Sequence, residues 1–202
     1  MNVLLKVCVV SDKFSQIIAA ARAAFEDKGY RVSMVDIAKR AGVAKQTLYN
    51  HFESKEALFA EVFTGCGAEA ASVLDNTTLS VADKIMAFAF ALRRVSMSPN
   101  GVAGYRAMTA EAHQFPELAA SFYQQGVGIL HRQTAAMLAE AHRLGQLVCP
   151  NPNLAADMLF SMLTGFERSR LLLGVAQGDD GTDARVAPIV AAFLRAFAAP
   201  AA

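Results

Sequence analysis

The sequence predicts an all-α fold, and three observations support that prediction. Of its 202 residues, 54% are hydrophobic and 18% are charged, a balance that favours a packed core over disorder. The hydrophobic excess is mostly Ala, Leu, Val, Phe and Met, which favour helices over strands. Apolar residues also recur at helical spacing, with helix-breaking residues between the repeats. We therefore expect about nine helices and no strand, arranged as a three-helix N-terminal domain and a C-terminal helical bundle.

The first predicted helix runs from about Asp12 to Lys28. Gly29 can adopt the left-handed conformation that commonly ends a helix. The residues before Asp12 are apolar, but the run is short and Lys6 interrupts it. We expect a tail or an extension of the first helix there, and neither a signal peptide nor a membrane span. One face of the helix is apolar, with residues at positions i, i+3, i+4, i+7 and i+11: Phe14, Ile17, Ile18, Ala21 and Phe25.

Two short helices joined by a tight turn are expected next. Ser33 is a favourable N-cap for a helix that begins at Met34 and ends near Ala41, because Gly42 breaks it. A third helix then starts around Lys45. This spacing is that of a helix-turn-helix motif.

The third helix gathers polar side chains on one arc. At ~100° per residue, with Lys45 at zero, Tyr49 falls at ~40°, Gln46 at ~100° and Asn50 at ~140°. Leu48 lies off this arc and can anchor the helix in a core. A DNA major groove accepts one α-helix and presents hydrogen-bond donors and acceptors on the base edges. The arc is therefore suited to reading DNA, although a short polar helix taken alone is more often a solvated face.

A fourth helix is expected after Ser54, a second favourable N-cap. We expect it to close at residues 76–78, which makes it ~20 residues and ~30 Å long. Lys55 lies in its first turn, where the helix dipole disfavours a cation. The conflict disappears if a phosphate binds there, because the free N–H groups and the ammonium then share one anion. Taken alone, Lys55 is more often an ordinary surface lysine.

Residues from about 15 to 63 carry a longer pattern, F…KGY…S…DIA…AGV…TLYNHF.SKE.L. This framework resembles the DNA-binding domain of the TetR family of bacterial transcriptional regulators. The resemblance implies that the third helix enters the major groove and that the start of the fourth touches the DNA backbone. It implies groove-facing or base-facing roles for Lys45, Gln46 and Thr47, and phosphate contacts for Ser33, Tyr49, His51 and Lys55.

The rest of the chain is divided into helices by turn residues. The predicted breaks are residues 76–78, 98–101, 149–153 and 178–181, with Asn153 as an N-cap. The predicted helices carry Val81 to about Met97, Val102 to about His113, Pro116 to Leu144, Leu154 to about Leu173, and Val186 to Phe197. We place a DNA-binding domain at residues 1–54 and a ligand-binding and dimerisation domain at residues 55–202.

The last two helices have more apolar surface than a small bundle needs, and they include small residues that permit close helix approach. Ordinary core packing would explain any one of these residues. The resemblance implies that these helices form a two-fold dimer interface, which suits a palindromic operator. The residues concerned are Leu154, Met158, Ser161, Met162, Gly165 and Ser169.

The middle helices are rich in Met and aromatic residues, which suit an adaptable apolar pocket as well as a plain core. The resemblance implies an effector pocket there, with two polar residues available for a ligand. The expected ligand-binding residues are Met86, Phe90, Met97, Arg106, Met108, His113, Phe122 and Tyr123.

These features together predict a cytoplasmic, ligand-responsive repressor. We expect a homodimer that a small apolar or amphipathic effector releases from double-stranded DNA, with no membrane partner. The three cysteines are widely spread without metal-ligand spacing, so we expect reduced thiols and no metal or cofactor. The net charge of the whole chain is +1, and this value does not by itself indicate nucleic-acid binding.

Two other classes of protein remain possible from the residues alone. One is an all-helical enzyme that uses Glu111, His113, His131 and His142, although their spacing forms no nucleophile–base pair or metal site. The other is a helical interaction module that does not bind DNA.

Overall fold

The computed structural model describes residues 3–64, 68–175 and 183–199. Within these residues the prediction of an all-α fold is confirmed, because they hold α-helices and short 3₁₀ helices but no strand beyond one isolated bridge between Leu147 and Ala198. Among the helices of this described part, none has both the length and the apolar character needed to cross a membrane. The α-helices are α1 Val3–Lys28, α2 Met34–Arg40, α3 Lys45–His51, α4 Lys55–Thr64, α5 Ala68–Leu74, α6 Val81–Ser96, α7 Pro99–Glu111, α8 Pro116–Gln125, α9 Val127–Arg143, α10 Pro152–Leu173 and α11 Val186–Ala196.

The chain divides into two compact units. The first unit comprises Met1–Gly65 and Ala103–Phe122, and the second comprises Cys66–Val102 and Tyr123–Ala202. Each unit has its own cluster of buried apolar side chains. The predicted domain boundary after residue 54 stays a prediction.

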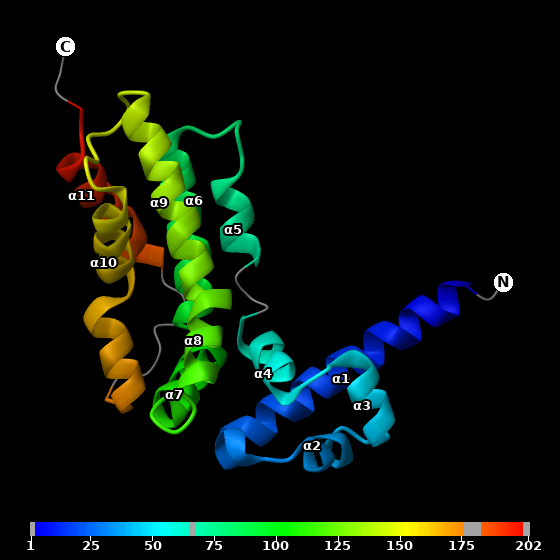
Figure 1. Cartoon of the computed structure of the whole chain (residues 1–202). Coiled ribbons are helices and arrows are strands. Elements are labelled where there is room, and N and C mark those ends of the chain that lie inside the picture. The colour runs from blue at the N-terminus through cyan, green and yellow to red at the C-terminus, as the bar shows by residue number, and fades with distance from the viewer. Residues whose placement is uncertain (1–2, 65–67, 176–182, 200–202) are drawn as a thin grey trace. The chain divides into compact units, whose positions relative to one another are not determined.

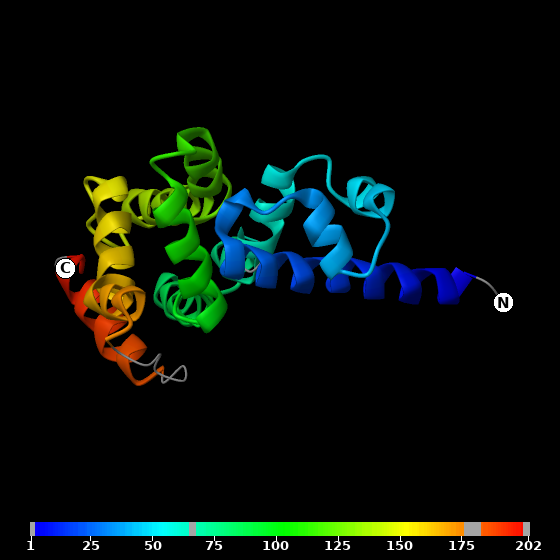
Figure 2. The same ribbon diagram turned by 90° about the horizontal axis from the view of Figure 1, so that it is seen from below.

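In the first unit, α2 and α4 pack against α1, and α3 packs against α2. Figure 2 shows α2 and α3 on the same side of the long α1. The predicted face of α1 is confirmed, since Ile17, Ala21 and Phe25 are almost fully buried. Phe59 of α4 meets Phe25 edge-on at 4.9 Å between ring centroids, so an aromatic contact holds α4 on α1.

The local signals of the helix-turn-helix segment are also confirmed. The Ser33 hydroxyl oxygen accepts a hydrogen bond from the Asp36 N–H at 3.1 Å and caps α2. Gly42 has a φ of 64°, a left-handed conformation that costs glycine little, and it turns the chain from α2 into α3. These two residues fix where the short helices begin and end.

The second unit is built around α6, α9, α10 and α11. In Figure 1, α9 runs beside α10 and α5 lies beside α6, and both pairs are packed together. Phe88, Leu138, Leu159 and Phe193 are fully buried in this core, one from each of the four central helices. The amphipathic helices expected in this part of the sequence therefore pack as a bundle.

The described residues hold eleven α-helices where about nine were expected. The predicted helix from Pro116 to Leu144 is divided, because Gly126 adopts φ −102° and ψ −109° and separates α8 from α9. The single fourth helix was expected to span residues 55–75. The structure describes α4 and α5 within that range, and residues 65–67 between them lie outside the described residues.

Two helix starts differ from the sequence predictions. Residues 98–101, expected as a turn, are the start of α7: the Ser98 hydroxyl accepts from the Gly101 N–H, and Pro99 is the first helical residue. The N-cap of α10 is Asn151 and not Asn153, since its side chain accepts from the Leu154 N–H with Pro152 at the first position. The predicted loop at residues 178–181 lies outside the described residues.

Candidate functional site

The short helix α3 turns its polar side chains outward. Lys45, Gln46, Tyr49 and Asn50 are all exposed, whereas Leu48 is fully buried in the core of the first unit. The predicted division of the helix into a polar arc and one apolar anchor is therefore present in the structure. Polar side chains displayed on one exposed helix face can meet hydrogen-bonding partners outside the chain.

The polar arc consists of two side-chain pairs, each one helical turn apart. The Gln46 amide N–H donates to the Asn50 Oδ1 at 3.0 Å, and the Lys45 ammonium lies 5.5 Å from the centroid of the Tyr49 ring. Pairs at i and i+4 restrict side-chain motion on a helix surface. Helical periodicity predicted that these four residues lie on one arc, but it did not predict that they form two interacting pairs.

Thr47 and His51 are less exposed than the other polar residues of α3. Both are half-buried, and the His51 ring packs edge-on against Phe14 at 6.1 Å between centroids. The aromatic contact orients His51 from the side of α1. Its phosphate contact stays a prediction.

Ser33 is exposed at the start of α2 and has two bonds to Asp36. Besides capping the helix, its hydroxyl donates to the Asp36 carboxylate at 2.7 Å. This hydrogen bond is the largest cause that lowers the pKa of Asp36. A phosphate at this position would have to compete with Asp36 for the hydroxyl proton.

Lys55 is the first residue of α4, after the Ser54 N-cap, whose hydroxyl accepts from the Ala57 N–H at 3.1 Å. The Lys55 ammonium donates to the Val32 carbonyl oxygen at 3.4 Å and lies 4.2 Å from the centroid of the Tyr30 ring. Neither partner carries an opposite formal charge. The cation is held at a helix N-terminus, where backbone N–H groups and the ammonium can bind one anion.

Tyr30 and Glu56 are polar residues at this site that the sequence did not single out. The buried Tyr30 donates its hydroxyl proton to the Glu56 carboxylate at 2.5 Å. Burial, together with this hydrogen bond, raises the pKa of Tyr30, and the same bond is the main cause that lowers the pKa of Glu56. Tyr30 belongs to the KGY motif that was recognised, so the motif marked the residue without revealing its partner.

The eight residues predicted to bind a ligand are distributed over both units, and their role stays a prediction. Met108 and Phe122 pack in the core of the first unit, whereas Met86 and Phe90 are partly buried against the core of the second unit. Met97 belongs to a separate small cluster with Val102 and Leu171, and Tyr123 is 55% exposed. Arg106 and His113 are in the first unit.

A cavity of about 460 Å³ lies in the second unit, among α5, α6 and α9 and the segments that adjoin them. Met137 and Val81 contribute apolar surface to it, and Gln133 contributes a polar side chain. None of the eight predicted ligand-binding residues lines this cavity.

One face of α10 is apolar and exposed, as the residues chosen for a dimer interface require. Leu154, Met158 and Met162 are spaced four apart and are 53%, 41% and 38% exposed. Phe166, which follows the kink at Gly165, is 86% exposed. The small residues Ser161, Gly165 and Ser169 form a second exposed row beside it. A helix face with large and small rows in parallel suits close packing against another helix.

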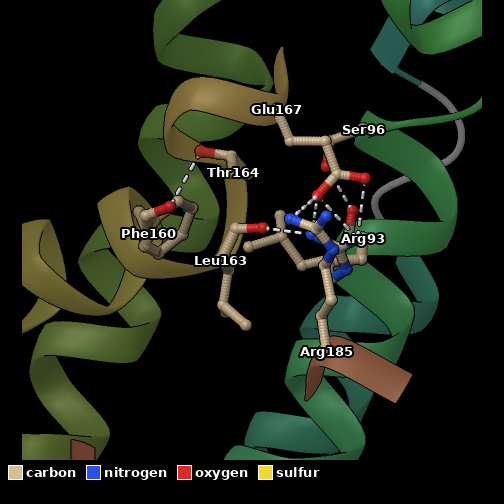
Figure 3. A network of polar contacts seen from close by, with 8 residues as sticks. Arg93, Ser96, Phe160, Leu163, Thr164, Glu167 and Arg185 are labelled. Atoms are coloured by element: carbon tan, nitrogen blue, oxygen red, sulfur yellow. Dashed lines mark hydrogen bonds and ion pairs between the residues drawn. The ribbon is translucent and has the colours of Figure 1, made fainter. Parts of the chain in front are cut away.

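The helix α10 is kinked at Gly165, where φ is 17° and ψ is −128°. The buried Arg93 of α6 donates to the Leu163 carbonyl oxygen at 2.6 Å and forms a bidentate pair with Glu167 at 3.0 to 3.1 Å. Figure 3 shows the Arg93 guanidinium beside these two acceptors, with the Arg185 side chain reaching toward the same Glu167 carboxylate. Arg93 thus supplies a donor at the kink, where the helix backbone is interrupted.

Comparison with known families matches most of the chain. Residues 17–62 match the model described as bacterial regulatory proteins of the tetR family. Residues 83–199 match the C-terminal domain of AefR-like transcriptional repressors. The first match covers α2 and α3, and the second covers α10 and α11.

Curated relatives are similar over part of their length. The A-factor receptor protein of Streptomyces griseus is 38% identical over 87 residues, which are 42% of this chain and 32% of that protein. The HTH-type transcriptional activator FasR of Mycolicibacterium smegmatis is 44% identical over 52 residues, which are 25% of this chain and 24% of that protein. The matches therefore span about a third or less of these relatives.

Solved structures are similar over nearly the whole chain. A TetR-family transcriptional regulator from Mesorhizobium loti is 28% identical with a TM-score of 0.73, over 93% of this chain and 98% of that one. The Flavonoid-responsive Regulator FrrA is 30% identical with a TM-score of 0.68, over 95% of this chain and 100% of that one. The chain therefore belongs to the TetR family of bacterial regulatory proteins and is a DNA-binding transcriptional regulator, not an enzyme.

Proposed function

We propose that this regulator is a repressor, which binds a palindromic operator as a homodimer and leaves it when a small apolar or amphipathic effector binds. The observation that carries the proposal is the polar face of α3, exposed in the same unit as the Lys55 ammonium at the start of α4. A helix that reads base edges and a cation that binds phosphate are the two kinds of contact that sequence-specific DNA binding needs.

The DNA contacts divide by the chemistry of the side chains. We assign Lys45, Gln46 and Thr47 to base edges or the groove, with Asn50 acting together with Gln46 through their hydrogen bond. We assign Ser33, Tyr49, His51 and Lys55 to phosphate oxygens. Residues 1–54 with the start of α4 then form the DNA-reading part, and the rest of residues 55–202 bind the effector and the second subunit.

The apolar face of α10 supports a homodimer, with α11 completing the interface. Because the large exposed side chains of Leu154, Met158 and Met162 lie in one row, a two-fold partner could cover them with the same row of its own. Two subunits related in this way carry two copies of α3 to two half-sites of a palindrome. The simplest geometry places the centres of the two half-sites one turn of the DNA helix apart, at ~34–36 Å.

The proposal of a small-molecule effector draws on the family and on the second unit. The relatives include a protein named for its response to flavonoids and a receptor for A-factor, and we extend small-molecule response to this chain. Met86 and Phe90, four residues apart on α6, are partly buried against the core of the second unit and could adapt to an apolar guest. An effector releases DNA only to the extent that it binds the non-operator conformation more tightly.

The test of DNA binding compares the DNA upstream of the protein's own gene with random DNA of the same length. We expect tighter binding to the upstream DNA at physiological salt, by at least a thousandfold for a specific site. Equal affinities for the upstream DNA and the random DNA would contradict the proposal. Transcription from that promoter in vitro separates repression from activation, which is the function of the relative FasR.

The test of the dimer places a charge on the α10 face. Met158→Glu should shift the protein toward monomer in analytical ultracentrifugation, because a carboxylate would be buried against the partner. Val148 is also 41% exposed but lies outside α10, so Val148→Glu is the matched control. A dimer of unchanged affinity in Met158→Glu would show that α10 is not the interface.

A further inference from the structure

The ammonium of Lys55 is held by partners that leave its charge available. Its contacts are the Val32 carbonyl oxygen at 3.4 Å and the face of the Tyr30 ring at 4.2 Å from the centroid. A carbonyl dipole and an aromatic face attract a cation without neutralising it. The side chain is therefore oriented, and the ammonium can still bind a phosphate.

The nearest competitor for Lys55 is the carboxylate of its neighbour, Glu56. A lysine and a glutamate at adjacent positions in the first turn of an exposed helix could swing together, and an ion pair would cancel the charge offered to DNA. In the structure, the Glu56 Oε1 instead accepts the Tyr30 hydroxyl proton at 2.5 Å. The hydroxyl of Tyr30 thus binds the carboxylate while its ring supports the ammonium, and the attraction that remains between Glu56 and Lys55 is the smallest of the causes that shift the pKa of Glu56.

Tyr30 is itself fixed on several sides by aromatic rings. Phe25 stacks on it at 6.2 Å between centroids, and Phe59 and Phe115 meet it edge-on at 5.5 and 5.2 Å. The side chain is 3% exposed, so it cannot shift without disturbing this core. A buried and immobile ring is a precise support for a flexible lysine side chain.

We propose that Tyr30 is a positioning residue for the Lys55 phosphate contact: its ring orients the ammonium, and its hydroxyl holds the Glu56 carboxylate away. The proposal rests on the proposed DNA contact of Lys55. Tyr30 does not touch DNA and acts through the two residues that begin α4.

The test measures how the affinity for the upstream DNA changes with salt concentration. The magnitude of the slope of log affinity against log salt concentration increases by ~0.9 for each phosphate that the protein neutralises. Tyr30→Leu removes the aromatic face, so the slope should fall as far as in Lys55→Ala, by about one phosphate for each subunit. Tyr30→Leu combined with Lys55→Ala should show no further fall, because both changes remove one contact.

The hydroxyl is tested separately by a variant that keeps the ring. Tyr30→Phe frees the Glu56 carboxylate to pair with Lys55, so the slope should fall. Adding Glu56→Gln should restore it, because an amide cannot pair with the ammonium as an ion. Tyr105→Phe, which removes a hydroxyl from α7, is the matched control and should keep the wild-type slope.

The outcomes separate this proposal from the proposed function. If Lys55→Ala lowers the slope but Tyr30→Leu or Tyr30→Phe keeps the wild-type value, the positioning role is overturned and the DNA contact stands. If Lys55→Ala itself keeps the wild-type slope, the DNA contact fails. A thermal unfolding curve for each variant identifies any variant that does not fold. If Tyr30→Leu does not fold, the slopes of Tyr30→Phe and of Tyr30→Phe with Glu56→Gln still test the positioning role of Tyr30.

Discussion

Arg93 in the second unit and Lys55 in the first are both cations beside a glutamate, but the two units use them in opposite ways. The buried Arg93 has its charge matched by the bidentate Glu167 carboxylate, and it also donates to the Leu163 carbonyl. Lys55 is half-buried and rests on a carbonyl and an aromatic ring, while the adjacent Glu56 is bound by Tyr30.

The difference separates a structural cation from a functional one. A buried charge must be paired and hydrogen-bonded within the chain, because leaving it unpaired costs several kcal/mol. A charge that binds DNA must stay unpaired within the chain and still be oriented. Changes at Arg93 should therefore alter stability, and changes at Lys55 should alter DNA binding.

The largest effect is expected from Glu167→Ala. It leaves the Arg93 guanidinium buried without its carboxylate, so the free energy of unfolding should fall by about 3–5 kcal/mol. Urea unfolding at one fixed protein concentration measures this, since a dimer's stability depends on concentration. Replacing both partners, Arg93→Met with Glu167→Leu, should recover much of the loss because no charge is then buried.

The control for this change is an ion pair on the surface. Glu140 and Arg143 form a pair on α9 in which both side chains are more than half exposed. Glu140→Ala should change stability little, because solvent screens such a pair. If Glu167→Ala costs no more than Glu140→Ala, the Arg93 pair is not structural and the comparison fails.

A second effect is expected in base preference, from the Gln46–Asn50 pair. Gln46→Ala should relax the choice of base at one position in each half-site, by about 1–3 kcal/mol of discrimination. Because the two amides are hydrogen-bonded, Asn50→Ala should weaken the same position, and the double variant should lose less than the sum. Sequencing the DNA selected by each variant measures the preference. A loss that is uniform over all sequences would mean that the pair only positions the backbone.

The same contrast explains how much of the molecule could be predicted from its sequence. The helix-turn-helix segment depends on local chemistry, such as the Ser33 cap and the left-handed Gly42, so its boundaries could be placed closely. The polar face of α3 followed from helical periodicity. The pairing of Tyr30 with Glu56 did not, because 26 residues separate them and only tertiary packing brings them together.

The second unit shows the other limit of sequence reasoning. The start of α7 could have been predicted from the sequence, because a serine followed by a proline is a helix-start pattern as well as a turn pattern. The break at Gly126 was harder to predict, because a single glycine is tolerated inside a helix. The kink at Gly165 lies beside the hydrogen bond from Arg93 to Leu163, and Arg93 is far away in sequence and belongs to α6. Contacts of that kind leave no local pattern.

A smaller effect, and one confined to DNA binding, is expected from Lys55→Ala. The slope of log affinity against log salt should fall by about 0.9 for each subunit, because one phosphate contact is lost. The midpoint of urea unfolding should stay near the wild-type value. Lys84, also half-buried but in the second unit, gives the matched control Lys84→Ala, which should keep the wild-type slope. A large loss of stability in Lys55→Ala would contradict the division between the two cations.

The smallest effect is a change of stability with pH. The Tyr30 hydroxyl is the main cause that lowers the pKa of Glu56 below its ordinary value of 4.5. A lowered pKa in the folded state adds stability that is complete above the ordinary pKa and is lost as the pH falls through the folded one. The stability difference between wild type and Tyr30→Phe should therefore be larger at neutral pH than below the folded-state pKa of Glu56. Unfolding curves over a series of pH values from 7 downward measure this difference, and Tyr105→Phe should show none of the change. A difference that stays equal over the whole series would mean that Tyr30 does not hold the ionised Glu56 carboxylate, and Lys55 would then lack the protection that distinguishes it from Arg93.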